Sequence, residues 1–452
     1  MSSPIQKSRV AVHTLGCKLN YAETSTLARQ FSEDGYTLTP FDAETDIFLL
    51  NTCSVTENAE KECRQIIRRV LRRSPNARVI VTGCYAQLRP EEIASINGVD
   101  LVLGSKEKFE AIRYFKMTEQ SEGPKIFANE IADATEFHAA VTSEEDQRTR
   151  AFLKVQDGCD YSCSFCTIPK ARGASRSAGV QEILDRAVQL CNEGFHEIVL
   201  SGVNVGDFGR KIDSSFYNLL YTLEKDPLVT ARIRISSIEP NLLTEEIIEL
   251  ASHSNKICPH FHIPMQSGSA KTLRAMQRRY TPETYRRVIE RIKSVLPNAC
   301  IGADVIVGFP GETDEDFRDS YDFINSLDLA YLHVFTYSER PGTKAASIAG
   351  TVSTATRKER NRMLRILSEK RKHAFYGSLL GNEANVLLER KQSEMREGFS
   401  EHYARVRLSA SVPDYAEIVR VRLDAIIGDM IIAEPIEVLS KSRREQILLP
   451  IL

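Results

Sequence analysis

The chain has 452 residues, which is too many for one hydrophobic core and favours about three domains. Its 42% hydrophobic and 27% charged residues are typical of a soluble globular protein, and the net charge of −2 excludes a nucleic-acid binder that uses its whole surface. The N-terminus lacks the pattern of a signal peptide, and we find no run of about 18 apolar residues, so we predict a cytoplasmic chain without a membrane span. In that compartment the ten cysteines are expected to be thiols or metal ligands rather than disulfides.

Residues 1–117 alternate short β-branched runs with amphipathic stretches. The clearest helical pattern covers 59–71, and the predicted strands are "RVAVHTL", "DIFLLN", "RVIVTG" and "DLVLG". This alternation predicts an α/β domain with a parallel sheet and helical crossovers. Residues 118–149 are polar and weakly periodic, and we interpret them as a linker or wrapping segment.

A second alternating series covers residues 150–378. Its predicted strands are "AFLKVQ", "EIVLSG", "RIRISS", "HFHIPMQ", "GADVIVGF" and "LHVFTYS", with helical patterns at 179–192, 269–277, 283–295 and 313–326. Six β/α units indicate a partial barrel, shorter than the closed eight-unit form. After a long helix around 357–372, short alternating strands at 379–442 predict a small β-barrel, followed by a tail at 443–452.

Three cysteines, Cys159, Cys163 and Cys166, follow the strand "AFLKVQ" at the edge where β/α barrels build active sites. A zinc knuckle with a distant fourth ligand, or three buried thiols, would be the simpler interpretations. The sharper one is a [4Fe–4S] cluster held by three thiolates, with one iron left free of protein ligands. A molecule with an amino group and a carboxylate, such as S-adenosylmethionine, can chelate that iron and be cleaved to a deoxyadenosyl radical. Phe165 would shield the cluster.

Three further cysteines follow predicted strands of the first domain at once. Because the carboxyl ends of parallel strands meet at one edge of a sheet, Cys17, Cys53 and Cys84 are expected to converge there, with Gly16 and Gly83 allowing sharp turns. Three unrelated core cysteines are the alternative. We interpret the other cysteines as packing residues, namely Cys63, Cys191, Cys258 and Cys300.

Together these residues resemble the radical S-adenosylmethionine methylthiotransferase family over almost the whole chain. The motifs that carry the resemblance occur in order: "TLGCKLN", "NTCSVT", "TGCYAQ", "GCDYSCSFCTIPKARG", "SGVNVG", "SSIEP", "HIPMQSGS", "MQRRYT", "DVIVGFPGET" and "TYSERPGT". The C-terminal β module resembles the TRAM domain with which this family binds RNA.

The resemblance implies that Cys17, Cys53 and Cys84 hold a second, auxiliary [4Fe–4S] cluster, which could carry the sulfur to be transferred. One S-adenosylmethionine would methylate that sulfur, and a second would supply the radical that activates the substrate carbon. The implied partners are the anticodon loop of tRNA, an electron donor such as flavodoxin or ferredoxin, and a sulfur source.

The motif "TLGCKLN" resembles the branch that modifies threonylcarbamoyl-adenosine in tRNA, at carbon 2 of the adenine next to the anticodon. The alternatives within the family are isopentenyl-adenosine in tRNA and an aspartate of a ribosomal protein. Outside it, an iron–sulfur protein that only binds RNA would need closed four-ligand sites, and an enzyme that only methylates would lack the cysteines of the first domain.

The resemblance also implies roles for polar residues at the strand ends. The expected cofactor contacts are Phe165, Ser201, Gly202, Asn204, Ser237, Glu239, Gln266, Val305 and Ile306, although a turn or a surface charge would explain Ser237 and Glu239 equally well. Basic residues beside the cysteine loop, after the helix that follows "HIPMQSGS", and in the β module would neutralise RNA phosphates. These are Lys170, Arg172, Arg176, Arg278 and Arg279, and in the module Arg405, Arg407, Arg420 and Arg422.

Overall fold

The computed structural model describes residues 8–53, 57–118, 121–132, 134–142, 149–389 and 395–441. The chain divides into two compact units. The first comprises Met1–Asp146, Phe152–Tyr161 and Cys166–Ala178, and the second comprises Gln147–Ala151, Ser162–Phe165 and Gly179–Leu452. Within the described ranges, none of the helices combines the length and the apolar character that a membrane span requires.

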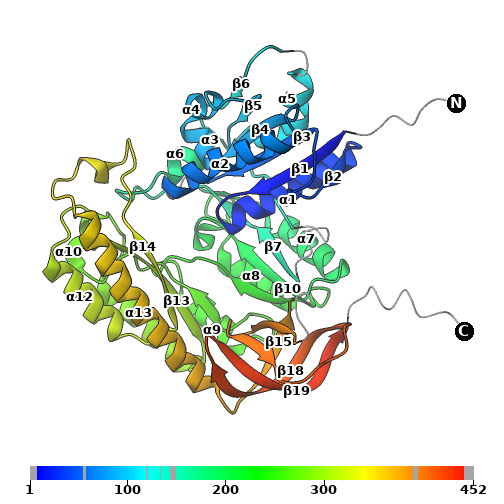
Figure 1. The fold of residues 1–452 in the computed structure, drawn as a ribbon. Coiled ribbons are helices and arrows are strands. Elements are labelled where there is room, and N and C mark those ends of the chain that lie inside the picture. Colours follow the sequence, from blue (N-terminus) through cyan, green and yellow to red (C-terminus); the bar gives the residue numbers. More distant parts are fainter. Residues whose placement is uncertain are drawn as a thin grey trace, which may run out of the picture. The chain divides into compact units, whose positions relative to one another are not determined.

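The first unit is built on a six-stranded parallel sheet, as the alternating pattern predicted (Figure 1). Its spatial order is β2-β1-β3-β4-β5-β6, formed by β1 Arg9–Thr14, β2 Thr37–Thr39, β3 Ile47–Thr52, β4 Arg78–Gly83, β5 Leu101–Leu103 and β6 Lys125–Phe127. The segment 118–149, interpreted from the sequence as a linker or wrapping segment, therefore supplies the edge strand β6.

Helices cover both faces of this sheet, because successive residues of each buried strand point to opposite sides. On one face Phe31 packs with Leu49, and on the other Ile67 packs with Phe48. The helical elements of the first unit are α1 Lys18–Glu33, α2 Glu57–Arg73, α3 Cys84–Leu88, α4 Pro90–Ala94, η1 Lys108–Glu110, α5 Ala111–Met117 and α6 Ile168–Arg172; a short ribbon pairs β8 Gln156–Asp157 with β9 Arg176–Ser177.

The second unit contains the predicted partial barrel. Its strands form two three-stranded sheets, of order β11-β10-β7 and β12-β13-β14, which isolated parallel bridges connect at Ile233–Ile257 and Ser237–His262. The strands are β7 Arg150–Lys154, whose last three residues belong to the first unit, β10 Glu197–Ser201, β11 Arg232–Ile235, β12 His260–His262, β13 Cys300–Val307 and β14 Tyr331–Thr336. The helices are α7 Val180–Asn192, η3 Val205–Asp207, α8 Phe216–Lys225, α9 Glu245–His253, α10 Ala270–Ala275, α11 Pro282–Val295, α12 Asp314–Asn325, η4 Lys344–Ser347 and α13 Thr354–Leu379.

The C-terminal strands close into a five-stranded barrel, which confirms the predicted β module. Its order is β15-β16-β17-β19-β18, from β15 Glu383–Leu388, β16 Glu397–Ser400, β17 Arg405–Leu408, β18 Ala416–Ile427 and β19 Met430–Lys441. One buried arginine of β11 attaches this barrel to the rest of the second unit. Arg234 pairs with Glu197 at 2.8 Å, lies 5.1 Å from the ring centroid of Tyr403, and donates to the main-chain oxygens of Ser400 and Glu401.

Two glycines allow the carboxyl ends of β1, β3 and β4 to pack closely. A Cβ atom at Gly16 would lie 2.6 Å from the Cβ of Cys53, and one at Gly83 would lie 2.3 Å from the carbonyl oxygen of Thr52. Both glycines also have φ near +100°, a sparsely populated region that costs an L-residue about 1–3 kcal/mol. Glycine is therefore required at these two positions for both conformation and space.

We expect Gly83→Ala to destabilise the protein more than Gly35→Ala does. Gly35 has φ +94° but no atom within 4 Å of its Cβ position, so only the conformational cost applies there. At Gly83 the overlap with backbone adds about 1–3 kcal/mol, as for other overpacked sites. Urea denaturation of the two variants measures the difference, and equal losses of unfolding free energy would contradict the close approach.

Candidate functional site

The three cysteines of the first unit lie at the ends of neighbouring parallel strands. Cys17 occupies the N-cap position of α1 without a side-chain capping bond, Cys53 follows β3, and Cys84 is the first residue of α3. Gly16 packs against the side chain of Cys53, and the pKa of Cys84 is raised by burial and also by the nearby Cys17. The predicted convergence of these cysteines at one edge of the sheet is confirmed.

This edge is also the topological switch point of the sheet. In the strand order β2-β1-β3-β4, the chain runs from β1 to its neighbour β2 toward one lateral edge of the sheet, and from β3 to β4 toward the opposite edge. In open α/β sheets, ligands bind in the crevice that such diverging connections leave at the carboxyl ends of the strands. Cys17 and Cys53 therefore occupy the position where this fold binds ligands.

A buried network of charged side chains lies behind the cysteines, within the first unit. Its centre is Arg172, whose guanidinium is 3.0 Å from Glu23, 2.9 Å from Asp157 and 2.5 Å from the side-chain oxygen of Asn20. Lys154 contacts both carboxylates at 2.9 Å. Further pairs join Lys108 to Glu23 at 2.6 Å and Arg176 to Asp157 at 3.2 Å.

Among the described residues of this network, four basic side chains face two carboxylates. Burial raises the pKa of Glu23 and Asp157, but the surrounding cations outweigh it and keep both pKa values below their ordinary range. Burial lowers the pKa of Lys108 to about 8. The excess of buried positive charge stabilises negative charge nearby, and Cys84 and Cys17 in turn help to raise the pKa of Arg172.

The second set of cysteines lies in one short loop, and every member is half-buried. In the first unit, backbone amides point at two of the sulfurs: the amide nitrogen of Tyr161 is 3.4 Å from Sγ of Cys159, and that of Ile168 is 3.4 Å from Sγ of Cys166. In the second unit, the guanidinium of Arg278 lies 3.1 Å from Sγ of Cys163. Hydrogen-bond donors of this kind stabilise thiolate ligands of iron–sulfur clusters.

Arg278 also orders the polar residues that follow β10 and β11. It forms a buried ion pair with Glu239 and contacts the hydroxyl of Tyr280 at 3.1 Å. Burial raises the pKa of Glu239, which Arg278 opposes. The side-chain oxygen of Asn204 accepts a hydrogen bond from the amide of Glu239 at 3.2 Å, so these residues form one connected group.

The cysteine loop is anchored in the second unit through Ser164 and Phe165. Ser164 is hydrogen-bonded to the main chain of Met276 at 3.0 Å, and Phe165 packs in the apolar cluster that includes Met276 and Ile306. Val305 and Ile306 are consecutive strand residues and so point to opposite faces. Only Ile306 therefore shares a face with the loop, and Val305 is buried on the other side.

The remaining predicted cofactor residues lie at carboxyl ends of barrel strands, where the sequence placed them. Ser201 closes β10 ahead of Gly202, and its hydroxyl bonds to the carbonyl of Val199 at 3.2 Å. Ser237 follows β11, with its hydroxyl 2.8 Å from Nδ1 of His262. Gln266 follows β12 with φ +66°, a left-handed conformation fixed by backbone hydrogen bonds to Asp304 and Ile306. Such conformations are concentrated at functional sites.

The basic residues predicted to contact RNA divide into two groups. The side chains of Arg172, Arg176 and Arg278 are only 2%, 12% and 4% exposed and form hydrogen bonds inside their own units. Lys170 and Arg279 are exposed.

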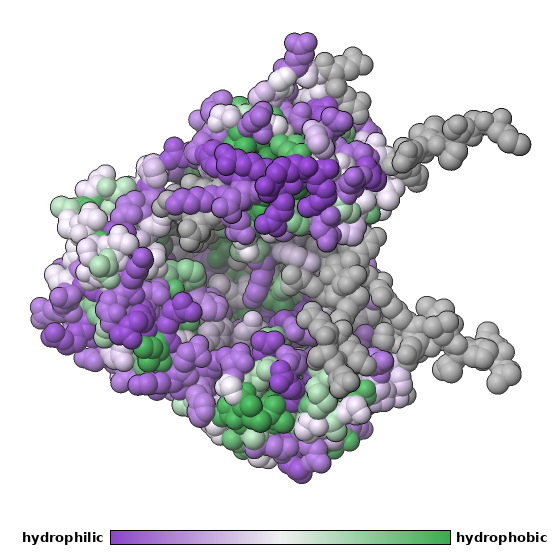
Figure 2. Space-filling view, in the orientation of Figure 1, coloured by the Kyte–Doolittle hydropathy of each residue, from purple (hydrophilic) through white to green (hydrophobic). Residues whose placement is uncertain are grey.

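On the small barrel, Arg405 and Arg407 are each 41% exposed and share the carboxylate of Glu397, and Arg405 also lies 3.9 Å from Asp429. Arg420 and Arg422 are also exposed, and they pair with Glu437 and Glu434. Figure 2 shows an apolar area on the surface of this barrel. The exposed apolar residues of the barrel include Ile427, Ile436 and Leu439.

The four cysteines interpreted as packing residues are buried. Burial raises the pKa of Cys258 to about 11 and that of Cys300 to about 12, so both remain thiols at neutral pH. Sequence reasoning missed Asn20 and Glu23, which lie three and six residues after Cys17. The signal that could have indicated them is their position as polar residues on a helix that also buries an apolar face.

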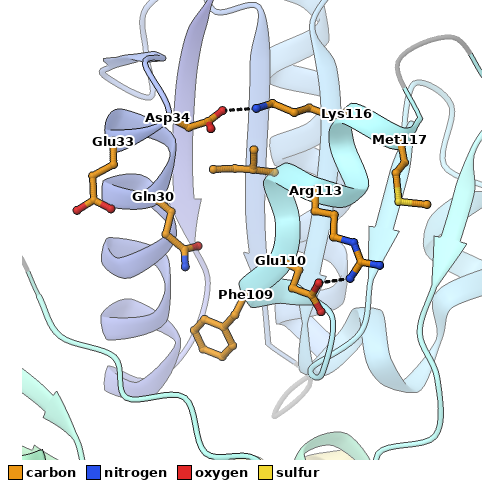
Figure 3. A pocket seen from close by; sticks show the side chains of 9 residues that line it. Gln30, Glu33, Asp34, Phe109, Glu110, Arg113, Lys116 and Met117 are labelled. Atoms are coloured by element: carbon orange, nitrogen blue, oxygen red, sulfur yellow. Dashed lines mark hydrogen bonds and ion pairs between the residues drawn. The ribbon is translucent and has the colours of Figure 1, made fainter.

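The first unit also has a shallow surface groove of about 790 Å³ between the end of α1 and α5. Figure 3 shows the ion pairs Asp34–Lys116 and Glu110–Arg113 at its rim. Gln30, a lining residue, is about 20 Å along α1 from Cys17 at 1.5 Å per residue. This groove is therefore separate from the cysteine site.

Two family models match the chain. The model of the uncharacterized protein family UPF0004 matches residues 9–104, which contain Cys17, Cys53 and Cys84. The model of the radical SAM superfamily matches residues 153–324, which contain the cysteine loop.

Similar proteins cover nearly the whole chain. The threonylcarbamoyladenosine tRNA methylthiotransferase MtaB of Bacillus subtilis (strain 168) is 38% identical over 92% of this chain and 93% of its own length. MtaB of Aquifex aeolicus (strain VF5) is 38% identical over 84% of this chain and 92% of its own length. The tRNA-2-methylthio-N(6)-dimethylallyladenosine synthase of Agrobacterium fabrum (strain C58 / ATCC 33970) is 33% identical over 94% of this chain and 97% of its own length.

Among solved structures, the radical S-adenosylmethionine methyltransferase TsrM from Kitasatospora setae, with cobalamin and a [4Fe–4S] cluster bound, has a similar fold. The TM-score is 0.57 at 16% identity, over 75% of this chain and 77% of that one.

We expect Arg172→Gln to lower the unfolding free energy of the metal-free protein by about 3–5 kcal/mol at pH 7, because buried Glu23 and Asp157 lose a partner. Their folded-state pKa values are depressed, so the stability they contribute is complete above their unfolded values of about 4 and is lost as pH falls below them. The difference between variant and wild type should therefore shrink below pH 4.

Urea denaturation at several pH values measures this difference. Arg113→Gln, which removes the exposed partner of Glu110, is the matched control and should leave stability unchanged. An Arg172 variant as stable as this control at pH 7 would contradict the role of the network.

Proposed function

Because the chain belongs to the radical S-adenosylmethionine tRNA methylthiotransferase family, within its threonylcarbamoyladenosine branch, we propose that it methylthiolates carbon 2 of the adenine in threonylcarbamoyl-adenosine next to the anticodon. The observation that carries this proposal is the set of three cysteines at the switch point of the first unit, beside a buried excess of positive charge. An enzyme that only methylates has no use for such a second set of ligands.

The loop cysteines Cys159, Cys163 and Cys166 fit a [4Fe–4S] cluster that also binds S-adenosylmethionine. Amide or guanidinium donors reach each sulfur, which suits thiolates rather than thiols. When bound, this cofactor pair supplies the radical that removes hydrogen from an unreactive C–H bond. Phe165 packs against the apolar cluster around Met276 and would shield the iron–sulfur cluster on that side.

Cys17, Cys53 and Cys84 fit an auxiliary [4Fe–4S] cluster. Two of them are buried, where an isolated thiolate would be strongly disfavoured. The surrounding network supplies the compensating charge through Arg172 and Lys108, both of which lower the pKa of Cys84. Cys17 is exposed, so a sulfur source and the substrate would approach the cluster from the side on which Cys17 lies.

The residues around the loop would hold S-adenosylmethionine. Glu239 and Asn204 form a polar pair that suits an amino group, and Arg278 orients Glu239. Ser201, Gly202, Gln266 and Ile306 follow or end neighbouring barrel strands and would complete this site. Ser237 is hydrogen-bonded to His262 and would contribute to the cofactor site by holding the imidazole of His262 in place.

The C-terminal barrel, residues 379–442, would bind the tRNA. Arg405, Arg407 and Lys372 face two carboxylates, those of Glu397 and Asp429, so this face keeps a positive charge that phosphates can neutralise. Lys170 and Arg279 are the exposed candidates near the cysteine loop. An electron donor such as flavodoxin or ferredoxin and a sulfur source complete the proposed partners. Isopentenyl-adenosine in tRNA is the second candidate substrate, supported by the 33% identity to the dimethylallyladenosine enzyme.

Mass analysis of tRNA nucleosides tests the substrate. In cells that lack the gene, the methylthio derivative of threonylcarbamoyl-adenosine should disappear and return with the wild-type chain but not with Cys17→Ala. Cys191→Ala, a buried cysteine of α7 outside both sets, is the matched control and should restore the product. Loss of methylthio-isopentenyl-adenosine alone would instead identify the second candidate.

Iron content of the purified variants tests the two clusters independently of activity. Cys17→Ala should retain about four of eight iron atoms per chain, since one cluster remains. Full iron content in this variant would contradict the auxiliary site, whatever the nucleoside result.

Replacing Arg405 and Arg407 together by glutamine should weaken tRNA binding and flatten its salt dependence. Each lost phosphate contact removes about 0.7–0.9 from the slope of log K against log salt. Arg186→Gln on α7, which removes a half-buried arginine paired with Glu182, should change neither quantity. Filter binding at several salt concentrations measures both, and an unchanged slope would exclude this face of the barrel.

A further inference from the structure

Three side chains that neither proposed cluster uses meet on one face of the sheet β12-β13-β14. His262 ends β12, Asp304 lies in β13 and His333 lies in β14. Asp304 is directly paired with His333, and His262 is paired with Gly302, two residues before Asp304. Paired residues point to the same side and residues two apart share a face, so the register alone places all three together.

The nitrogen and oxygen atoms of these side chains have the spacing of metal ligands. One ligand atom from each residue lies within 4.8 Å of the other two. Nε2 of His262 is 3.1 Å from Oδ1 of Asp304, and Nδ1 of His333 is 3.3 Å from the same oxygen. Ligand atoms around a tetrahedral zinc ion, with bonds of about 2.0–2.1 Å, are roughly 3.3 Å apart.

The surroundings of His262 fix its orientation in the way that metal-binding histidines require. Its other nitrogen, Nδ1, is 2.8 Å from the hydroxyl of Ser237. If Nδ1 donates its proton to Ser237, the lone pair of Nε2 faces a carboxylate oxygen. Two lone pairs can face each other at this distance only with a proton or a cation between them. A hydrogen-bond partner on the second ring nitrogen, which holds the imidazole in place, is a regular feature of metal sites.

Packing holds the rings of this group in place. The ring of Tyr331 lies parallel to that of His262, with centroids 6.4 Å apart, and its centroid is 5.2 Å from that of His333. A side chain at position 302 would collide with Tyr331, so Gly302 makes room for this ring. His333 is 54% exposed and Asp304 is 22% exposed, which leaves an entry path for an ion.

We propose that His262, Asp304 and His333 bind a divalent first-row cation of the zinc class. Two imidazole nitrogens and one carboxylate are a ligand set that such cations accept. Three protein ligands leave at least one coordination position for an oxygen atom of water or of a bound molecule. Asp304 lies on the same strand face as Ile306, about 7 Å before it along β13, and Ile306 packs against the same apolar cluster as Phe165.

Zinc binding to the iron-loaded full chain tests the proposal without any measurement of activity. The protein is equilibrated with zinc, desalted, and analysed for zinc and iron. Wild type should retain about one zinc ion per chain more than His333→Ala and Asp304→Asn, because each variant removes one ligand. Asp304→Asn keeps the volume and the hydrogen-bonding capacity of the side chain, so it guards against loss of folding in the other variant.

His253→Ala is the matched control. This histidine is 80% exposed at the end of α9, outside the group, and its loss should leave zinc content at the wild-type value. Equal zinc in all four proteins would overturn the proposal, and the imidazole–carboxylate contacts would then be hydrogen bonds only. X-ray absorption of the wild-type protein should show nitrogen and oxygen neighbours at about 2.0–2.1 Å, whereas sulfur neighbours at about 2.3 Å would place the zinc on cysteines and also overturn it.

Discussion

The buried guanidinium of Arg172 is the interaction on which the first unit depends. Arg172 lies six residues after Cys166, and it contacts Asn20 and Glu23 on the helix that begins after Cys17. It also contacts Asp157, two residues before Cys159. One side chain therefore fixes the segments that carry ligand cysteines of both proposed clusters. A shift of this guanidinium would displace both sets of ligands together.

Stability alone does not explain such a network. Buried ion pairs recover little more than their desolvation cost, and well-packed apolar residues of the same volume are often more stable. The network instead has more basic groups than carboxylates beside cysteines that are themselves buried. An anionic group at the cysteines would complete its charge balance. The same residues that order the segments would thereby favour a cysteine-bound group that carries negative charge.

The sequence predicted the elements that have strong periodicity and the cysteines that follow them. Strands β1, β3 and β4 are long enough to be recognised, and parallel topology then dictates that Cys17, Cys53 and Cys84 share an edge. The missed strands β2, β6 and β16 have three or four residues, too few for alternation to be visible. Their existence depends on the neighbouring strand, which no local pattern contains.

The burial of basic residues was harder to predict, because charge suggests exposure. Arg172 and Arg278 were expected to contact RNA, yet both are buried against carboxylates distant in the sequence. Arg278 and Glu239 are 39 residues apart, and Arg172 and Glu23 are 149 apart. Pairing over such separations is set by the tertiary fold, so a single sequence carries no local signal for it.

Side-chain contacts in the second unit run without a break from the small barrel toward the cysteine loop. Arg234 packs on Tyr403 of the barrel, whose ring centroid is 6.2 Å from that of Tyr331, and Tyr331 packs on His262 and His333. Asp304 joins the two histidines, and Ile306 on the same strand face packs against the apolar cluster around Met276, as Phe165 of the cysteine loop also does. A barrel of β/α units usually fills this interior with branched apolar side chains. Here, polar and aromatic groups take that place, and each needs a partner because an unpaired polar group in the interior is costly. The geometry of this interior therefore depends on Tyr403, which the small barrel supplies at one end, and on Phe165, which the cysteine loop supplies at the other. The proposed RNA-binding module is thereby linked to the shape of the proposed cofactor site.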